Sequence, residues 1–279
     1  MSNPPPRHQL SRRTRRRRTI VVLVAAVLVI AGVVTAVALA SRGGATMPVP
    51  SNTSSRSAPP SATPTSTPTP TPTPTPTFDK GAQSIDDPSS YWVVVNKLRP
   101  LAPQDYEAPD LVSVPVPFAN EPVLRQAASD AVVAMFAAFT AETGLQMQSQ
   151  SAYRSYSTQV AVYQGWVDSL GQAGADATSA RPGFSEHQTG LAVDVSALPA
   201  DCTLDACFAD TPQGQWLAAN GWRFGFILRY PADKTAITGY EFEPWHMRFV
   251  GVELATRMHE TGVTTLEEFF GLPAAPQYG

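Results

Sequence analysis

Proline stands at every second position from Pro68 to Pro76, within the run TPTSTPTPTPTPTPT at residues 63–77. Proline lacks a backbone N–H donor and fixes φ, so this run can form neither a helix nor a sheet ladder. Such tracts favour extended polyproline II. The tract therefore divides the chain, and a large globular domain has to follow it. We expect residues 41–77 to be a disordered Pro/Thr-rich stalk.

A charge-free run precedes the stalk. Residues 19–40 read TIVVLVAAVLVIAGVVTAVALA, which as a helix would span about 33 Å, enough for a hydrocarbon core of about 30 Å. Residues 1–18 hold seven Arg and no acid, and the positive-inside rule places this basic tail in the cytoplasm. We expect a single transmembrane signal-anchor helix in a bacterial cell membrane, with the rest of the chain outside.

A cleaved signal peptide is the alternative for this run. Ala38-Leu39-Ala40 has the small-x-small form of a cleavage site. The apolar region of a signal peptide is about 7–15 residues long, however, and this run is longer. The sequence therefore favours an anchor that is retained.

The charge of the chain changes sign along its length. All 23 acidic residues lie from Asp79 onward, together with 11 Lys and Arg. An acidic surface argues against nucleic acid as a partner, because a phosphate backbone needs basic residues. Residues 78–279 have the composition and length of one globular domain with a sizeable core, and nothing in them indicates an obligate protein partner.

Hydrophobic periodicity predicts three helices and five strands in this domain. The helices are residues 121–143, ended by Gly144, residues 155–170, ended by Gly171, and residues 211–220, ended by Gly221. The strands are residues 92–95, 145–149, 191–196, 224–228 and 245–250. Because helices and strands do not alternate regularly, we expect an α+β fold with a small, mainly antiparallel sheet and flanking helices.

Cys202 and Cys207 are the only two cysteines of the chain. Outside the membrane, a disulfide that closes their short loop is the default. A metal pair is the alternative, but two thiols without a nearby His make a poor metal site. We predict the disulfide.

Two of the three histidines in the domain have unusual neighbours. His187 stands in SEHQTGLAVDV at 185–195, where the predicted strand carries Asp194 among apolar residues. A carboxylate in such a strand is costly unless something pairs it. Thr189-Gly190 offers a turn that can fold His187 back over the polar face of the strand. One imidazole and one carboxylate would then meet a single ion.

His246 stands in EPWHMRF at 243–249. In a strand after the proline, His246 and Arg248 share one face, and Glu243 can turn back toward His246. Together with the first pair, this gives two His and one carboxylate, a common ligand set for catalytic zinc that leaves a position for water. A further Glu that is not a ligand is what a metal hydrolase needs as its base.

Ordinary structural roles stay open for all of these residues at this point. A lone His is more often a hydrogen-bonded structural or surface residue than a metal ligand. Arg154, after Ser151-Ala152-Tyr153, fits an anion-binding role or a plain surface position. We expect His259 on the solvated surface of a late helix and Trp245 in the core.

Four stretches, in this order, resemble the VanY-type D-alanyl-D-alanine carboxypeptidases. They are SAYRSYSTQ at 151–159, PGFSEHQTGLAVDV at 182–195, GWRFGFILRYP at 221–231 and ITGYEFEPWHMRFVG at 237–251. The stretch VVNKLRPLAPQDYEAPDLV at 94–112 is similar to the lead-in of that family. The resemblance covers about residues 90–252. It implies the α+β fold shared by peptidoglycan metallopeptidases and the Hedgehog signalling domain.

The resemblance also implies roles for single residues. His187, Asp194 and His246 match the zinc ligands of the family, Glu243 matches its catalytic base, and Arg154 matches the Arg that binds substrate and stabilises developing negative charge. Ser185 and Gln159 also fit the motif, either as substrate contacts or through local structural hydrogen bonds. The implied reaction is zinc-dependent removal of the terminal D-Ala from peptidoglycan stem peptides, in cell-wall maturation or glycopeptide resistance.

Two alternatives to this function stay open. The ligand motifs are shared with relatives that cleave other bonds, namely D,D-dipeptidases, L,D-carboxypeptidases and endopeptidases. A non-catalytic, zinc-containing wall-binding module belongs to another class. The presence of both Glu243 and Arg154 argues against such a module, because a protein released from catalysis does not need them.

Overall fold

The structure is a computed structural model and describes residues 78–279. The predicted basic tail at 1–18, signal-anchor helix at 19–40 and stalk at 41–77 lie outside the described residues. Among residues 78–279, no helix combines the length and the apolar character needed to cross a membrane.

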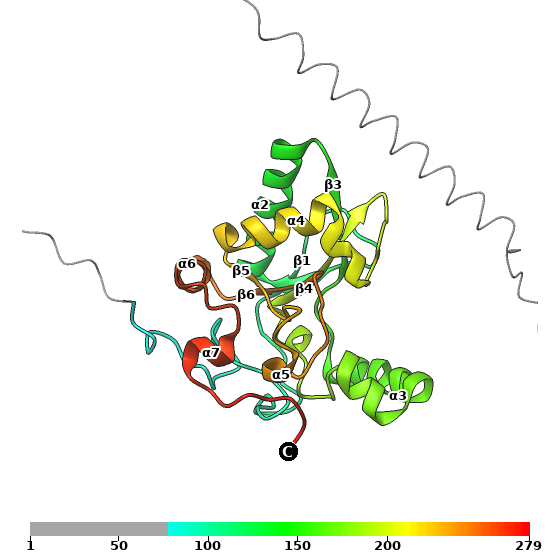
Figure 1. The fold of residues 1–279 in the computed structure, drawn as a ribbon, viewed down its shortest axis with the longest axis vertical. Coiled ribbons are helices and arrows are strands. Elements are labelled where there is room, and N and C mark those ends of the chain that lie inside the picture. Colours follow the sequence, from blue (N-terminus) through cyan, green and yellow to red (C-terminus); the bar gives the residue numbers. More distant parts are fainter. Residues whose placement is uncertain (1–77) are drawn as a thin grey trace, which may run out of the picture. The chain divides into compact units, whose positions relative to one another are not determined.

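A four-stranded antiparallel sheet, in the order β3-β4-β6-β5, forms the centre of the described domain (Figure 1). Its strands are β3 (Gln146–Ser151), β4 (Ala192–Leu198), β6 (His246–Phe249) and β5 (Phe226–Leu228). A second antiparallel pair joins β1 (Leu111–Ser113) to β2 (Val123–Arg125). The prediction of an α+β fold with a small, mainly antiparallel sheet is confirmed.

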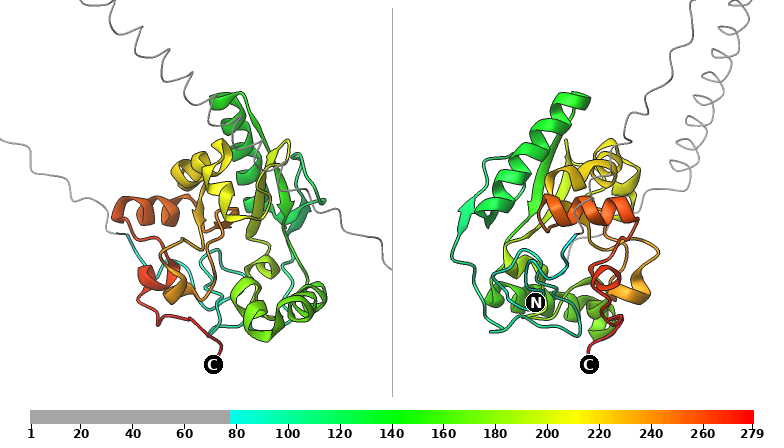
Figure 2. Two further views of the ribbon diagram at one scale, coloured as in Figure 1. Left: turned by 45° about the vertical axis from the view of Figure 1, so that its right-hand side comes forward. Right: turned by 90° about the vertical axis from the view of Figure 1, so that its left-hand side faces the viewer.

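Helices surround this sheet. They are α2 (Gln126–Thr143), α3 (Tyr156–Thr178), α4 (Pro212–Asn220), α5 (Thr235–Thr238), α6 (Val252–Thr261) and α7 (Leu266–Phe270), with 3-10 turns η1 (Glu186–Thr189), η2 (Ala206–Asp210) and η3 (Gly221–Phe224). Helix α2 packs on β3, α4 on β4 and β5, and α6 on β5 and η3. Helix α3 lies apart from them, at the opposite end of the domain from α2 (Figures 1 and 2).

One face of the sheet is covered by the main hydrophobic core. Val193 and Val195 of β4 and Met247 of β6 point into this core, where side chains of α2 and α4 meet them. Side chains alternate along a strand, so Asp194 and His246 leave the opposite face. The core therefore fixes the position of the strands that carry two of the predicted metal ligands.

Two predicted helices have different bounds from those expected. Helix α2 begins at Gln126, because the three residues before it pair with β1 as strand β2. The second predicted helix does not stop at Gly171. Gly171 takes φ 74° and ψ 169°, which interrupts the helix, and a further helical segment follows to Thr178. The third predicted helix is confirmed, with Thr211 as N-cap, although the chain continues from Gly221 into η3.

The strand predicted at residues 92–95 is wrong: this segment belongs to neither sheet of the described domain. Val93 and Val95 are buried in the main core, whereas Trp92 and Val94 are buried in a second cluster with residues of α6 and α7. Burial on both sides gives an apolar run that resembles a buried strand. The other four predicted strands are confirmed to within two residues at each end.

Candidate active site

Strands β4 and β6 place two predicted ligands opposite each other. Asp194 and His246 are partners in the antiparallel register, so their side chains leave the same face at neighbouring positions. Oδ1 of Asp194 lies 3.1 Å from Nδ1 of His246. The polar faces predicted separately for the two strands thus form one face of the sheet.

His187 reaches the same point from turn η1. Gly190 ends this turn at φ 69°, a left-handed conformation, and a Cβ atom there would lie 2.8 Å from Cδ2 of Leu111. The chain therefore folds back over β4, as the Thr189-Gly190 pair predicts. Nε2 of His187 lies 3.3 Å from Oδ2 of Asp194.

The three side chains form a ligand set: His187, Asp194 and His246 are all buried, and one ligand atom of each lies within 4.8 Å of the others. Nδ1 of His187 lies 2.7 Å from the carbonyl oxygen of Ala152, which leaves Nε2 for a metal. Nε2 of His246 lies 3.4 Å from Oε2 of Glu186, which leaves Nδ1. Such outer contacts fix the orientation of metal-binding imidazoles. Two imidazole nitrogens and one carboxylate fit zinc.

A buried ion network, made of Glu186, Arg229, Arg248 and Glu267, supports this ligand set from behind. Oε1 of Glu186 accepts hydrogen bonds from Nε of Arg229 at 2.8 Å and from a terminal nitrogen of Arg248 at 2.7 Å. The two terminal nitrogens of Arg229 donate to Glu267 of α7 at 2.9 and 2.8 Å. Each buried charge thus has partners of opposite sign.

The network keeps Glu186 ionised. Burial alone would raise the pKa of Glu186, but Arg248, Arg229 and His246 outweigh this effect and hold its pKa well below the usual range. Glu186 therefore presents a charged acceptor to Nε2 of His246. This contact orients the ring so that Nδ1 faces Asp194.

Glu243 lies beside the ligand set without being part of it. Its Oε2 is 3.7 Å from Nδ1 of His246, and its carbonyl oxygen accepts a hydrogen bond from the backbone N–H of His246 at 3.1 Å. The predicted turn back toward His246 is therefore present. Burial raises the pKa of Glu243 to about 8. A buried carboxyl group beside a ligand set is placed to accept and return a proton.

Arg154 enters the site between β3 and α3. Its backbone N–H donates to the carbonyl oxygen of His187 at 3.2 Å. Its Nε is buried and has no hydrogen-bond partner among the described residues. Burial lowers the pKa of Arg154, and the charges of Asp194 and Glu243 oppose that shift. A guanidinium with unused donors beside a metal site can bind an anionic group.

The ligand set, Glu186, Glu243 and Arg154 line one cleft with a volume of about 360 Å³. Ser185 is buried and lines the cleft too. Gln159 is fully buried outside the lining, and its Nε2 donates to the carbonyl oxygen of Ala180 at 2.7 Å. Structural hydrogen bonding therefore accounts for Gln159, while substrate contact by either residue stays a prediction.

The structure also tests the predictions for the two cysteines, His259 and Trp245. Cys202 and Cys207 form the predicted disulfide. His259 is exposed, as expected, and its ring stacks on that of Trp222 at 4.2 Å. Trp245 is only half-buried: it packs against the core but also lines the cleft.

The sequence reasoning missed Glu186 and its partners. A signal was available, because Arg248 shares a strand face with His246, and a buried arginine needs a counter-charge. Glu186, next to His187, supplies it. It also missed Tyr230, whose ring centroid lies 4.9 Å from that of His246.

Comparisons with known proteins agree with this geometry. The family model described as VanY, D-alanyl-D-alanine carboxypeptidase, matches residues 121–252. The protein YodJ of Bacillus subtilis (strain 168) is 40% identical over 195 residues, which cover 68% of this chain and 70% of YodJ.

Two solved structures are similar as well. The LdcB LD-carboxypeptidase superposes with a TM-score of 0.61 at 39% identity, covering 66% of this chain and 87% of LdcB. A variant of the vancomycin-resistance D,D-pentapeptidase VanY, solved in complex with Zn(II), has a TM-score of 0.52 at 33% identity and covers 63% of this chain and 97% of that one. With the His-Asp-His ligand set, these findings make zinc the metal and metallopeptidase the enzyme class. The chain belongs to the VanY family of D-alanyl-D-alanine carboxypeptidases.

Proposed function

We propose that this protein is a zinc-dependent D,D-carboxypeptidase that removes the terminal D-Ala from peptidoglycan stem peptides. One observation carries the proposal: the ligand set, Glu243 and Arg154 line the same cleft, and Nε of Arg154 has no hydrogen-bond partner among residues 78–279. A structural zinc site would need neither a buried base nor a free cation. Family membership supports the choice of bond.

Glu243 handles the protons of the reaction. His187, Asp194 and His246 would hold the zinc ion, which would supply Lewis-acid chemistry when bound. The positive charge of the metal favours the carboxylate form of Glu243, so this side chain can take a proton from a water molecule. It then delivers the proton to the amine of the leaving D-Ala. Burial beside His246 keeps Glu243 in reach of both events.

Arg154 can stabilise negative charge on the substrate. Within the described domain, Nε of its guanidinium has no hydrogen-bond partner and one terminal nitrogen contacts Oγ of Ser151 at 3.5 Å, so donors remain for the substrate. Donors held in place before the reaction stabilise an oxyanion as it develops. The same group can hold a substrate carboxylate.

An L,D-carboxypeptidase is the second candidate. The likeness to the LdcB LD-carboxypeptidase, at a TM-score of 0.61 and 39% identity, favours it. The ligand set and base would be the same for either bond. The two activities differ in whether the substrate ends in D-Ala-D-Ala or in a single D-Ala after an L-centre.

The place of action is also a proposal, supported by the sequence alone. A signal-anchor helix at 19–40 would hold the chain in the cell membrane, with the domain at the wall. A stalk of residues 41–77 in polyproline II, at about 3.1 Å per residue, would reach on the order of 100 Å. This distance suits a substrate that lies beyond the membrane surface.

Product analysis tests the function directly. Zinc-loaded full-length protein in detergent is offered a pentapeptide ending in D-Ala-D-Ala, the matching tetrapeptide ending in one D-Ala, and the dipeptide D-Ala-D-Ala. We expect release of one D-Ala from the pentapeptide, no activity with a chelator, and almost none in Glu243→Gln. Preferred cleavage of the tetrapeptide would support the L,D-activity instead. No cleavage of any peptide by folded, zinc-loaded protein would reject both.

A further inference from the structure

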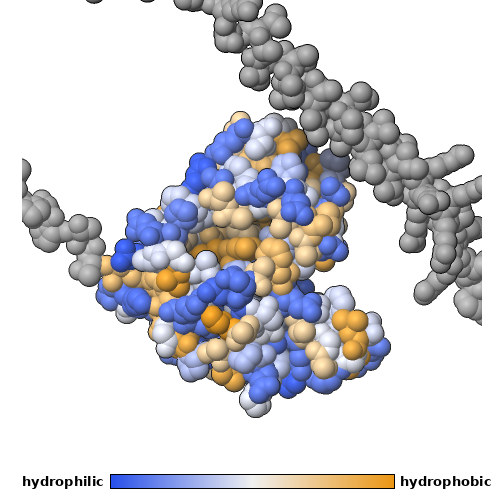
Figure 3. All heavy atoms as spheres, in the orientation of Figure 1, coloured by the Kyte–Doolittle hydropathy of each residue, from blue (hydrophilic) through white to orange (hydrophobic). Residues whose placement is uncertain are grey.

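We propose that Tyr278 is a positioning residue: it joins two walls of the cleft and thereby holds Glu243 beside the ligand set. The first wall, residues 178–181, continues from the end of α3, and the second wall, residues 240–243, ends in Glu243; both contribute to the lining of the cleft. In Figure 3 a notch opens beside the part of the domain that carries α3. The inference deepens the proposed function and rests on it for the role of Glu243.

The hydroxyl of Tyr278 contacts both walls. It accepts a hydrogen bond from the backbone N–H of Arg181 at 2.8 Å, and it lies 3.3 Å from the hydroxyl of Tyr240. Because a phenolic hydroxyl can donate one hydrogen bond and also accept, Tyr278 can make both contacts at once. One backbone hydrogen bond, from the N–H of Glu241 to the carbonyl oxygen of Ala177 at 3.2 Å, also joins the second wall to α3.

The ring of Tyr278 packs against the first wall. The guanidinium of Arg181 lies over this ring, 4.1 Å from its centroid, and the ring of Phe184 meets it edge-on at 5.1 Å. The same guanidinium donates two hydrogen bonds to Asp176 of α3, at 3.0 and 2.9 Å. Arg181 therefore connects α3, the first wall and Tyr278.

Tyr278 belongs to a tail segment, residues 272–279, that runs past α5 in Figure 1. Ala275 of this segment is fully buried, and its backbone N–H donates to the carbonyl oxygen of Ile237 at 2.7 Å. Gly239 has φ 82°, and a Cβ atom there would collide with the carbonyl oxygen of Ala275. The tail segment is thus fixed against the root of the second wall before the chain reaches Tyr278.

A buried cation supports the contact between the two tyrosines. Lys97 is 3% exposed, and its amine donates to the carbonyl oxygen of Gly239. Nζ of Lys97 lies 4.6 Å from the ring centroid of Tyr240 and 5.6 Å from that of Tyr278. Rings beside a desolvated cation attract it, so Lys97 draws both tyrosines to one point.

The second wall connects this point to the metal end. The ring centroid of Tyr240 lies 4.7 Å from that of Tyr230, which lies 4.9 Å from that of His246. The backbone N–H of Glu243 donates to the carbonyl oxygen of Tyr230 at 3.1 Å. A second wall released from Tyr278 would therefore shift Glu243 relative to the ligand set. Misplacement of a reacting group by about 1 Å can cost about 10²-fold in rate.

Steady-state kinetics test this role with full-length, zinc-loaded protein and the pentapeptide ending in D-Ala-D-Ala. Tyr278→Phe removes the hydroxyl and keeps the ring, so kcat should fall about three- to tenfold. Tyr278→Ala removes the ring as well, and kcat should fall about 10²-fold. KM should stay within about twofold in both variants, because Tyr278 does not line the cleft.

A spectroscopic measurement separates positioning from a general structural role. The three ligands lie on neither wall, so the visible absorption spectrum of Co(II)-loaded protein should be the same in both variants as in the starting protein. The midpoint of urea unfolding should change little in Tyr278→Phe, which retains the ring contacts with Arg181 and Phe184.

A double-mutant cycle tests the contact between the two hydroxyls. Tyr240→Phe removes the other hydroxyl of the pair, so the double variant should lose no more kcat than the more impaired single variant. Tyr156→Phe is the matched control, because Tyr156 is half-buried at the start of α3 and does not line the cleft. Its kcat and KM should be unchanged.

Amide hydrogen exchange follows the second wall without any need for turnover. The N–H groups of Glu241 and Glu243 are hydrogen-bonded across this wall. Exchange in a peptide that covers residues 240–243 should become about three- to tenfold faster in Tyr278→Phe, while exchange in β4 should not change.

Unchanged kcat in Tyr278→Ala would overturn the inference, even with faster exchange, because the wall would then move without any effect on Glu243. Additive losses in the double variant or an altered Co(II) spectrum would also overturn it. The proposed function is judged by product formation in the starting protein. If that protein cleaves no peptide, the function is rejected, while unchanged exchange in Tyr278→Phe rejects only the role of Tyr278.

Discussion

The two ends of the cleft are built in opposite ways. At the metal end, Glu186, Arg229 and Glu267 are at most 1% exposed, and each charge is paired through hydrogen bonds. At the outer end, Trp166 and Leu204 are each at least 40% exposed and come from an interrupted helix and a short cross-linked loop. Substitution of any one of these three charged residues leaves a buried partner charge unpaired. Trp166 and Leu204 can change without that cost, so the outer cleft can vary while the metal end stays fixed.

Two residues that support the metal end lie outside the part of the sequence that matches the family model. Glu267 of α7 follows that region, and Asn96, whose Nδ2 donates to Oε1 of Glu267 at 2.9 Å, precedes it. Both ends of the described domain are thus joined to Arg229 and, through Glu186, to His246. The metal site therefore depends on the folded domain as a whole.

The largest effect expected is on catalysis at the metal end. Glu243→Gln should lower turnover by about 10²–10⁴-fold, because the variant cannot exchange protons with water and the leaving amine. Zinc affinity, measured by competition with a chelator, should change little, since Glu243 is not in the ligand set. A parallel loss of zinc would instead make Glu243 a ligand.

The next effect concerns the buried ion network. Glu186→Gln leaves Arg229 and Arg248 short of a counter-charge and should lower the free energy of unfolding by about 3–5 kcal/mol. It should also weaken zinc binding by about 10–100-fold, since His246 loses its charged acceptor. Urea unfolding and chelator competition measure the two quantities.

A surface pair provides the matched control for that substitution. Glu260 lies 3.5 Å from Arg257, and both side chains are exposed. Glu260→Gln should therefore change stability by less than about 1 kcal/mol. Equal effects of the two substitutions would remove the contrast between a buried, paired metal end and an adaptable exterior.

Within the metal end, the pH dependence of the metal-free protein should separate the two glutamates. The pKa of Glu186 in the folded protein lies well below its ordinary 4.5, because Arg248 and Arg229 outweigh the opposing effect of burial. Between this lowered pKa and pH 4.5, the unfolded chain therefore binds more protons than the folded protein does. The stability that Glu186 contributes is present above about pH 4.5 and is lost as the pH falls.

The contribution of Glu243 to stability changes with pH in the opposite direction. Burial raises its pKa from 4.5 to about 8, so the folded protein binds more protons between these values. Its contribution is greatest below pH 4.5 and is lost as the pH rises through about 8. Glu243→Gln should reduce the decline toward pH 8, to which His246 also contributes, and Glu186→Gln should reduce the acid-side loss, to which Asp194 also contributes. Unfolding curves from pH 2 to 9 with a chelator check this, and changes in the same direction would contradict it.

The ligand set could be predicted from sequence because each ligand breaks a local pattern. Asp194 interrupts an apolar strand, and His187 precedes a Thr-Gly turn that returns the chain to that strand. The role of Glu186 could not be predicted in this way. Its partner Arg229 comes 43 residues later, and only the packed fold brings the two together.

The errors in the fold have equally local causes. Residues 92–95 look like a strand because they are buried on both sides, between two clusters and without a partner strand. Gly171 looks like a helix end because a left-handed glycine both ends helices and interrupts them. The position of Trp166 and Leu204 at the cleft could not be predicted, because an exposed Trp or Leu has no sequence signature. Only the folded structure shows that both side chains line the cleft.

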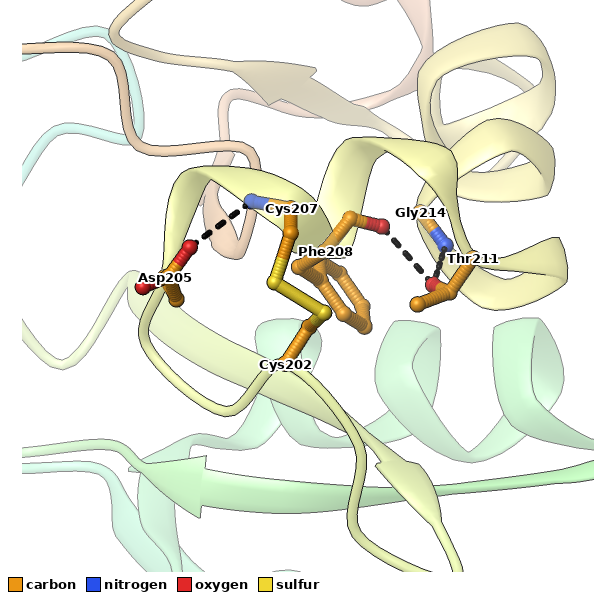
Figure 4. The surroundings of a disulfide bond; sticks show 6 residues. All are labelled: Cys202, Asp205, Cys207, Phe208, Thr211 and Gly214. Carbon is orange, nitrogen blue, oxygen red and sulfur yellow. Dashed lines mark hydrogen bonds between the residues drawn. A yellow bond between two sulfur atoms is a disulfide. The ribbon is translucent and has the colours of Figure 1, made fainter. Parts of the chain in front are cut away.

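The smallest effect is expected at the loop closed by the disulfide, where a change should alter substrate binding more than folding. Replacing both Cys202 and Cys207 by Ser opens a very short loop, so stability should fall by about 2 kcal/mol or less. The hydrogen bond from the Cys207 N–H to Asp205 and the burial of Phe208 remain to hold the segment (Figure 4). Leu204, freed from its left-handed conformation at φ 50°, can leave the cleft. Because Leu204 lines the cleft, we expect a higher KM for the pentapeptide ending in D-Ala-D-Ala, with kcat and zinc affinity unchanged. A fall in kcat with KM unchanged would mean that the loop supports the metal end, and the division between a fixed chemical end and an adaptable outer end would not hold.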